Sequence, residues 1–146
     1  LLDMGLDPIN FADALIGVLA QRLVRTLCEN CKEPYKPAEE EVDHLVQLYG
    51  SECFPELGVD LESVELMKAV GCDSCLNSGY KGRTGLHEVV LTSAEIKKMI
   101  SQKSTIGELR EQAVKEGMRS ILQDGIYKIF KGATDYKQLL SVTSSD

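Results

Sequence analysis

Cys-Glu-Asn-Cys at residues 28–31 and Cys-Asp-Ser-Cys at residues 72–75 form two C-x2-C knuckles with forty residues between them. A tetrahedral zinc ion takes four thiolate ligands, and a spacing of two residues lets one tight turn direct both thiolates of a pair at the same ion. We therefore predict a zinc site whose ligands are Cys28, Cys31, Cys72 and Cys75. Four thiolates leave no open coordination position, so the predicted site is a structural staple without a catalytic role.

Other interpretations of these cysteines are two disulfides, a thioredoxin-like dithiol, an iron–sulfur cluster or chance spacing. A redox dithiol needs one C-x-x-C, whereas this chain has two, and the second is followed by a glycine-rich turn. Duplication therefore favours a metal. We expect Lys32, Lys81 and Arg83 to offset the site's net charge of about −2, and we expect the fifth cysteine, Cys53, to be an unpaired thiol.

The length of 146 residues and a hydrophobic content of 43% suit one globular domain with its own core. No apolar run approaches the roughly 20 residues of a membrane-spanning helix, and no secretory signal pattern is present. With reduced thiols, this predicts a cytoplasmic protein. Because the chain opens on Leu1 within a stretch typical of the middle of a fold, we expect an excised fragment.

The net charge of −7 is unevenly distributed, because residues 38–65 contain nine acidic residues and no Lys or Arg. Such an acidic segment repels nucleic acid phosphates. It is either an ordinary solvated face or a docking surface for a basic partner.

The segment before the first knuckle predicts a long helix over residues 9–27, which begins with Asp7 as N-cap and Pro8 at the first helical position. Its middle is apolar nearly all round, so we expect burial on several sides. A short amphipathic helix is predicted over residues 38–49, with His44 on the surface, and residues 51–63 are predicted to be a loop.

Two extended segments, residues 64–70 and 86–91, are predicted to form an antiparallel hairpin joined by the second knuckle. His87 is expected to be a half-buried structural residue of its second strand. The Gly-Arg-Thr-Gly stretch at 82–85 lacks the phosphate-loop pattern, so no Walker A motif is present.

The chain from Thr92 onward is predicted to be helical. Capping boxes begin at Thr92, Thr105 and Ser120, Gly117 and Gly132 are expected to end helices, and Thr134 is expected to cap a last short helix with Leu139 and Leu140 inward. Ile106 is expected on a buried face. The predicted fold class is α+β, mainly α, divided into residues 1–27, a zinc-binding insertion at 28–91 and a helical subdomain at 92–146.

Together these motifs resemble the C-terminal part of a GspE/PilB-type traffic ATPase of type II secretion and type IV pilus assembly. The resemblance covers the whole chain and rests on four features: the paired knuckles, Gly-Val-Leu-Ala-Gln-Arg-Leu-Val-Arg at 17–25, Gly-Tyr-Lys-Gly-Arg-Thr-Gly-Leu-His-Glu at 79–88, and Gly-Met-Arg at 117–119 followed by Asp-Gly at 124–125.

The resemblance implies that a RecA-like ATPase core precedes this chain in a cytoplasmic hexamer. That hexamer would be peripheral at the inner membrane, where it powers pseudopilus or pilus assembly with inner-membrane platform and cytoplasmic-domain proteins as partners. The four cysteines map onto the family's tetracysteine zinc site, and Arg22 and Arg83 fall in segments that face a nucleotide or a neighbouring subunit. ATP and magnesium belong to the intact parent. The Walker A, Walker B, Asp and His boxes are missing here, so we expect this chain alone to be inactive.

The leading hypothesis is a zinc-stapled, non-catalytic portion of such an ATPase that shapes subunit contacts and relays motion. A zinc-ribbon module for nucleic acid is the alternative, but it requires basic residues and interleaved aromatic residues, and this chain has no Trp and no basic stripe. A thiol oxidoreductase is a third reading, which native thiol titration would separate from a zinc site.

Overall fold

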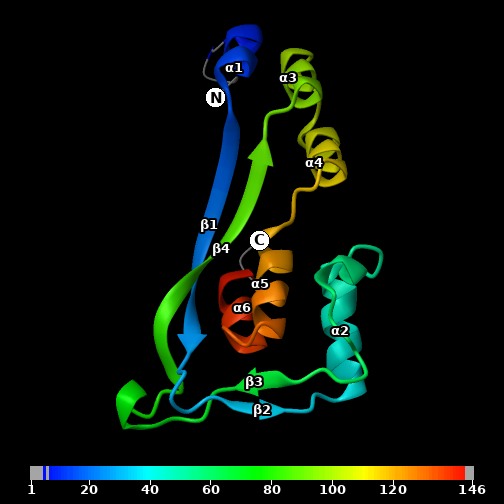
Figure 1. The fold of residues 1–146 in the computed structure, drawn as a ribbon. Coiled ribbons are helices and arrows are strands. Elements are labelled where there is room, and N and C mark those ends of the chain that lie inside the picture. Colours follow the sequence, from blue (N-terminus) through cyan, green and yellow to red (C-terminus); the bar gives the residue numbers. More distant parts are fainter. Residues whose placement is uncertain (1–4, 6, 144–146) are drawn as a thin grey trace. The chain divides into compact units, whose positions relative to one another are not determined.

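The computed structural model describes residue 5 and residues 7–143, and its fold is α+β (Figure 1). Its elements are, in chain order, α1 (Pro8–Ala14), β1 (Gly17–Leu27), β2 (Glu33–Tyr35), α2 (Glu39–Tyr49), the 3-10 turn η2 (Phe54–Leu57), β3 (Leu66–Lys68), the 3-10 turn η3 (Asp73–Cys75), β4 (Tyr80–Leu91), α3 (Ala94–Ser101), α4 (Ile106–Lys115), α5 (Ile121–Phe130) and α6 (Tyr136–Thr143). Within the described ranges, no helix combines the length and the hydropathy needed to cross a bilayer.

The two cysteine knuckles organise the strands. The first knuckle connects β1 to β2, and the second lies between β3 and β4. β1 pairs with β4 to form one two-stranded sheet, and β2 pairs with β3 to form another, antiparallel with Glu33 opposite Lys68 and Tyr35 opposite Leu66. Figure 1 shows β2 and β3 running side by side. Both knuckles thus lie at the passage from one strand pair to the other.

The predicted helix over residues 9–27 is wrong beyond Ala14. Its start is confirmed, since Asp7 accepts a hydrogen bond from the Asn10 amide at 2.9 Å and Pro8 is the first helical residue. The chain then becomes extended and forms β1. Hydrogen bonds to β4 satisfy this segment's backbone, so tertiary pairing outweighs its moderate helix propensity.

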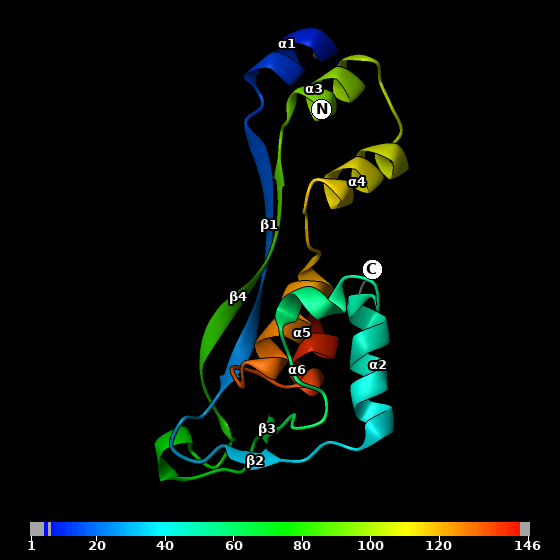
Figure 2. The same cartoon turned by 45° about the vertical axis from the view of Figure 1, so that its right-hand side comes forward.

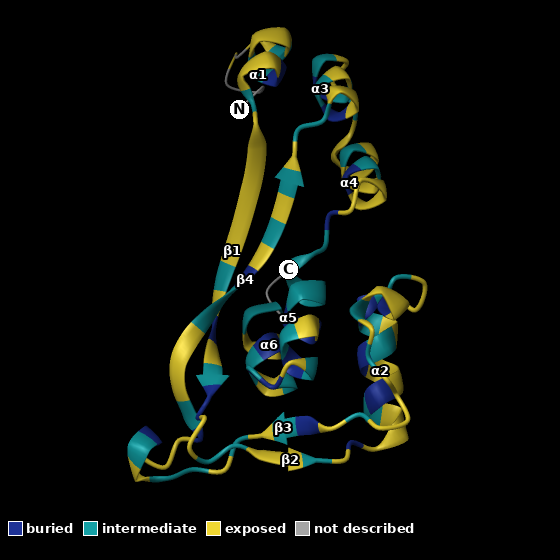
Figure 3. Cartoon of the chain, in the orientation of Figure 1, coloured by how far each residue is buried: buried dark blue, intermediate teal, exposed yellow. Residues whose placement is uncertain are grey.

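The expected burial of this segment on several sides is also wrong for the described chain. Ile16, Val18 and Leu19 are 83%, 53% and 61% exposed, and Figure 3 shows the first half of β1 as exposed. In its second half, Arg22, Val24 and Thr26 alternate as buried or half-buried positions. This period of two is typical of a strand with one covered face.

The predicted hairpin between residues 64–70 and 86–91 is wrong as well. β3 pairs with β2, and β4 begins at Tyr80 and pairs with β1. Each knuckle therefore connects strands of different sheets. Residues 82–85 lie inside β4 and form neither a loop nor a helix start.

The chain packs as two compact units, the first of which comprises Leu1–Ala20 and Glu88–Ser120. In this unit α1 packs against α3, and α3 against α4. Its buried core is formed by residues from these helices and the following turn: Ala12, Ile96, Ile100, Ala113 and Met118. Ile106, predicted to be buried, is 85% exposed at the start of α4.

The second unit comprises Gln21–His87 and Ile121–Asp146. Here α5 packs against both α2 and α6 (Figure 2), and the predicted amphipathic helix at 38–49 is confirmed as α2. The core combines strand and helix residues: Val24, Leu45, Tyr49, Phe54, Leu66, Leu86, Ile126, Ile129 and Leu139. Leu139 is fully buried as predicted, whereas Leu140 is 41% exposed.

The helix boundaries confirm some predicted caps and correct others. Thr105 forms the predicted capping box with Glu108. α3 is capped by Ser93 instead of Thr92. In α6 it is Asp135, not Thr134, that accepts from the amide of the first turn. Thr134 is fully buried, and its hydroxyl donates to the Arg25 carbonyl at 2.8 Å.

The glycine stops are confirmed, because Gly117 and Gly132, each the second residue after the end of α4 or α5, have φ values of +99° and +67°.

Candidate metal centre

The sulfur atoms of the four knuckle cysteines form one compact cluster. All four lie within 4.8 Å of one another. Three separations are 3.9 Å (Cys28 to Cys72), 3.8 Å (Cys31 to Cys75) and 3.8 Å (Cys72 to Cys75). A tetrahedron of sulfurs with metal–sulfur distances of about 2.3 Å has edges of about 3.8 Å. The donor set and its geometry therefore fit a tetrahedral metal ion such as zinc.

The cysteines are free thiols in this arrangement. A disulfide requires a sulfur–sulfur distance of about 2.05 Å, so the separations correspond to neighbouring ligands and not to bonded pairs. Cys53 is likewise a free thiol, as predicted; it is half-buried and packs against the core of the second unit.

The first knuckle is a tight turn that follows the end of β1. The Cys28 carbonyl accepts hydrogen bonds from the amides of Cys31 and Lys32 at 3.1 and 2.8 Å, which closes the turn. The Cys28 amide donates to the Gly79 carbonyl at 2.9 Å and so holds the first knuckle beside the second. Cys28 is only 1% exposed. Backbone hydrogen bonds thus position the buried ligand Cys28.

The second knuckle supplies backbone N–H groups to the sulfurs. The amides of Cys72 and Gly79 donate to Cys75 Sγ at 3.2 and 3.3 Å, and the Gly71 amide donates to Cys31 Sγ at 3.3 Å. Hydrogen bonds of this kind stabilise negative charge on a thiolate and orient it toward a metal. They are the outer layer of the site.

Two of these donors are glycines for steric reasons. Gly71 has a φ of +123°, and a Cβ there would lie 2.8 Å from the Asn77 carbonyl oxygen. Gly79 has a φ of +77°, and a Cβ there would lie 2.7 Å from the Ala69 Cβ. The sequence placed Gly79 in the glycine-rich turn after the second knuckle, but neither glycine was predicted to donate to a cysteine sulfur. The available signal was a glycine directly before Cys72 and another four residues after Cys75.

The environment drives the pKa values of two thiols apart. Burial raises the pKa of Cys31 to about 12, and the neighbouring thiols add to this, while the Gly71 amide lowers it. Burial also raises the pKa of Cys75, but the Cys72 and Gly79 amides and the adjacent thiols outweigh it and lower the value to about 6. Ligation requires thiolates, so a metal displaces protons from the tetrad and binds more tightly as the pH rises.

Two lysines contact the knuckles. Lys32 Nζ donates to Glu29 Oε1 at 2.8 Å and to the Gly132 carbonyl at 3.0 Å, and Lys81 Nζ donates to Ser74 Oγ at 2.9 Å. Lys32 therefore joins the first knuckle to the turn between α5 and α6. Arg83, the third cation expected near the site, is an exposed residue of β4.

The two predicted nucleotide or interface residues lie on the paired strands of the second unit. Arg22 is half-buried on β1, and Arg83 is exposed on β4. Neither is a member of the cysteine cluster. Their role stays a prediction.

The two histidines lie away from the cluster. His44 is exposed, as predicted, and its Nε2 is 2.9 Å from the Tyr136 hydroxyl. The prediction of a half-buried His87 is wrong, because this residue is exposed on β4. The His87 amide donates to Asp124 Oδ2 at 2.8 Å, and its Nδ1 is 3.7 Å from the same oxygen.

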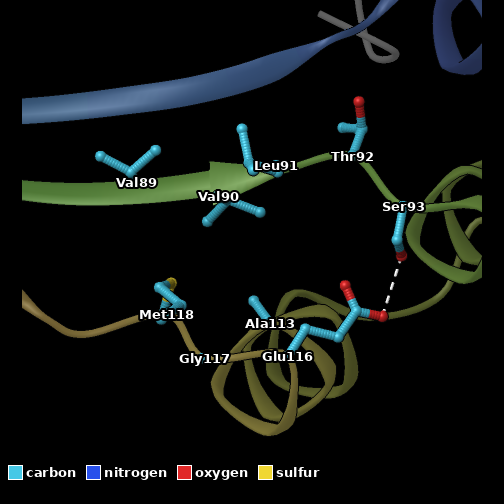
Figure 4. A pocket seen from close by; sticks show the side chains of 9 residues that line it. All are labelled: Val89, Val90, Leu91, Thr92, Ser93, Ala113, Glu116, Gly117 and Met118. Atoms are coloured by element: carbon cyan, nitrogen blue, oxygen red, sulfur yellow. Dashed lines mark hydrogen bonds between the residues drawn. The ribbon is translucent and has the colours of Figure 1, made fainter.

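The first unit contains a separate cavity of about 490 Å³ between the end of β4 and the end of α4 (Figure 4). Its walls include Val90, Ala113 and Met118. The one carboxylate among its lining residues, Glu116, accepts a hydrogen bond from Ser93 Oγ at 2.8 Å, and that same hydroxyl caps α3. Ser93 and Glu116 therefore connect the start of α3 to the end of α4.

Nearly the whole chain is similar to proteins of known families. The family described as "Type II/IV secretion system protein" matches residues 1–141. A type IV pilus assembly ATPase PilB from Thermus thermophilus is 38% identical over 97% of this chain and 15% of its own length. Type II secretion system protein E from Aeromonas hydrophila is 39% identical over 99% of the chain and 26% of its own length. The type II secretion system ATPase E of Vibrio cholerae is 38% identical over 98% and 26%. The chain thus spans only about a quarter or less of the length of these relatives.

Proposed function

The chain belongs to the type II/IV secretion system protein family, and we propose that it is the zinc-stapled C-terminal part of an ATPase that powers type II secretion or type IV pilus assembly. The relatives named as ATPases of these two systems support this assignment. The chain's own part in the work is structural: it shapes subunit contacts and relays motion.

The observation that carries the structural role is the convergence of four cysteine sulfurs within 4.8 Å. The ligands Cys28, Cys31, Cys72 and Cys75 complete a tetrahedral set, so a bound zinc ion supplies cross-linking and no open position for a substrate. Because each knuckle connects strands of two different sheets, one ion fixes both strand pairs. This is the arrangement of a staple.

ATP chemistry belongs to the intact parent protein in this proposal. A RecA-like core provides the phosphate loop and the acidic magnesium ligands, which this chain lacks. The parent works as a hexamer, peripheral on the cytoplasmic side of the inner membrane, with platform and cytoplasmic-domain proteins as partners. Arg22 and Arg83 face a nucleotide or a neighbouring subunit. Residues 1–27 adjoin the core, residues 28–91 form the zinc-binding insertion and residues 92–146 form the C-terminal helical subdomain.

Elemental analysis of the purified chain tests the metal assignment. We expect one zinc ion per chain, and we expect Cys72→Ser to lower the zinc content strongly because it removes one of four ligands. Cys53→Ser is the matched control: it removes a half-buried thiol outside the cluster and should leave the zinc content unchanged. A zinc content near zero in the unmodified chain, or one that Cys72→Ser leaves intact, would contradict the proposal.

A further inference from the structure

We propose that the tetracysteine cluster is an oxidant-modified site, at which a hydroperoxide converts the four thiolates into two disulfides that link one knuckle to the other, Cys28 to Cys72 and Cys31 to Cys75. This inference rests on the proposed zinc staple. It adds that the staple has a second, covalent form that persists without the metal.

Access to the cluster is uneven. Cys28 and Cys75 are 1% and 6% exposed, whereas Cys31 and Cys72 are half-buried. A small oxidant therefore reaches Cys31 or Cys72 first. Each of these two accessible sulfurs has a buried sulfur of the opposite knuckle beside it, Cys75 at 3.8 Å and Cys28 at 3.9 Å.

Two contacts make the cross-knuckle pairing available. Joining Cys28 to Cys72 and Cys31 to Cys75 uses all four sulfurs, and both pairs are already within 3.9 Å. The competing reactions close each knuckle on itself, since Cys72 Sγ also lies 3.8 Å from Cys75 Sγ and all four sulfurs are within 4.8 Å of one another. We expect cross-knuckle pairing to prevail because the backbone bond from Cys28 to Gly79 and the pairing of β2 with β3 hold the knuckles side by side.

Hydrogen peroxide is the oxidant that converts each pair of thiolates into a disulfide. An accessible thiolate attacks one oxygen of hydrogen peroxide, which breaks the O–O bond, releases hydroxide and leaves a sulfenic acid. The thiolate of the opposite knuckle then attacks that sulfur, forms the S–S bond and releases a second hydroxide. Each disulfide thus consumes two thiolates and one peroxide, which is reduced by two electrons. Two peroxides oxidise the tetrad, and its sulfurs then lack the negative charge that ligation requires.

The two disulfides keep the ends of residues 32–71, the segment between the knuckles, joined to each other. A disulfide from Cys28 to Cys72 joins the same chain positions that a shared ion joins, so residues 33–35 and 66–68 stay paired after oxidation. Chelation of the reduced chain removes the same link without replacing it. Oxidised and chelated samples, both free of metal, should therefore differ in backbone protection of β2 and β3.

Peptide mapping identifies which cysteines are joined by disulfides. In a Cys53→Ser background, trypsin cleavage after Arg25, Lys32, Lys68 and Lys81 places both cysteines of the first knuckle on residues 26–32 and both of the second on residues 69–81. Zinc-loaded chain is treated with hydrogen peroxide beside a zinc indicator, alkylated and digested without reductant. We expect one zinc ion released per two peroxides consumed, and the two peptides recovered as one covalent species. Fragmentation of that species should give Cys28–Cys72 and Cys31–Cys75.

The results of this experiment test the cross-knuckle disulfides and the zinc staple separately. Release of zinc with the two peptides recovered separately, each with an internal disulfide or with sulfonic acids, overturns the cross-knuckle modification and leaves the zinc staple intact. A chain without zinc before peroxide is added overturns the staple and this inference together. Dithiothreitol followed by zinc should restore the starting zinc content, and hydrogen exchange should find β2 and β3 better protected in the oxidised sample than in the chelated one.

Discussion

At the scale of single residues, the metal centre depends on small residues as much as on its ligands. Gly79 donates its amide to Cys75 Sγ and accepts from the Cys28 amide, so it contacts both knuckles through its backbone. Its positive φ and the close Ala69 Cβ exclude a larger side chain. The position therefore couples backbone conformation to ligand geometry.

We expect Gly79→Ala to lower the free energy of unfolding of the zinc-loaded chain by about 2–4 kcal/mol, because left-handed strain and a steric clash act together. Urea unfolding measures this, and zinc loss to a chelator should be faster. Gly58→Ala is the control: Gly58 also has a positive φ, but a Cβ there has no neighbour within 4 Å, so strain alone should cost about 1 kcal/mol. If both variants lose the same free energy of unfolding, the structure around residue 79 shifts enough to relieve the clash with Ala69, which would contradict the prediction.

At the scale of elements, the contact of α5 with α6 is set by the absence of a side chain at Gly125. A Cβ at this position would lie 2.2 Å from Leu139 Cδ1. Gly125 is buried inside a helix, where glycine is about 1 kcal/mol less favourable than alanine. Close packing of the fully buried Leu139 compensates for this weakness of the helix.

We expect Gly125→Ala to destabilise the chain by about 1–3 kcal/mol, since overpacking outweighs the gain in helix propensity. Gly107→Ala, at an exposed position of α4 whose nearest neighbour is 4.0 Å away, should instead stabilise by about 0.5–1 kcal/mol. These changes are measurable by thermal or urea unfolding.

The pair Gly125→Ala and Leu139→Ala tests the contact itself. Leu139→Ala alone should cost about 2–5 kcal/mol as a core truncation. It also removes the clashing methyl group, so the double variant should lose less than the sum of the two single losses. If the loss of stability in the double variant equals the sum of the two single losses, the added methyl group at position 125 does not clash with Leu139.

At the scale of the whole molecule, the C-terminal helices divide between the two packing units. α3 and α4 belong to the first unit, whereas α5 and α6 belong to the unit that contains the cysteines. The turn between α5 and α6 is fastened to the first knuckle and the end of β1 by three bonds: Lys32 Nζ to the Gly132 carbonyl, the Leu27 amide to the Ala133 carbonyl, and Thr134 Oγ1 to the Arg25 carbonyl. The first knuckle is thus connected by hydrogen bonds to the turn between α5 and α6.

Removal of zinc from the reduced chain should therefore loosen the second unit more than the first. We expect hydrogen exchange after chelation to lose protection most at residues 28–85, next in α5 and α6, and least in α3 and α4. Cys53→Ser, treated in the same way, should give the same pattern. Uniform loss of protection along residues 7–143 would contradict a local staple.

The chain alone should not hydrolyse ATP, because phosphoryl transfer requires positioned magnesium and a phosphate loop. Turnover equal to the buffer blank is the expected result, and measurable hydrolysis would contradict it. If the proposed function holds, Arg22→Ala and Arg83→Ala in the proposed full-length oligomer should each lower the ATPase rate, because a cation that reaches the phosphates stabilises the charge that develops on them. Wild-type rates with unchanged zinc content and assembly would restrict both arginines to a structural role.

Features that depend on local spacing could be predicted from the amino-acid sequence. The two C-x2-C knuckles predicted one four-cysteine cluster, Asp7 and Thr105 predicted helix starts, and Gly117 and Gly132 predicted helix ends, because turn geometry, caps and positive φ are properties of a few neighbouring residues. The amphipathic pattern of α2 and the general course of the C-terminal helices also followed from local periodicity.

The pairing of the strands and the extended conformation of β1 depend on contacts between distant parts of the chain. Residues 17–27 carry an apolar pattern compatible with a helix, and their strand conformation depends on backbone hydrogen bonds to β4, more than fifty residues away. The pairing of β2 with β3 likewise follows from the meeting of the knuckles. Local propensities differ by less than about 1 kcal/mol per residue, so long-range backbone pairing around the cysteine cluster determines the outcome, and no short window of sequence contains that information.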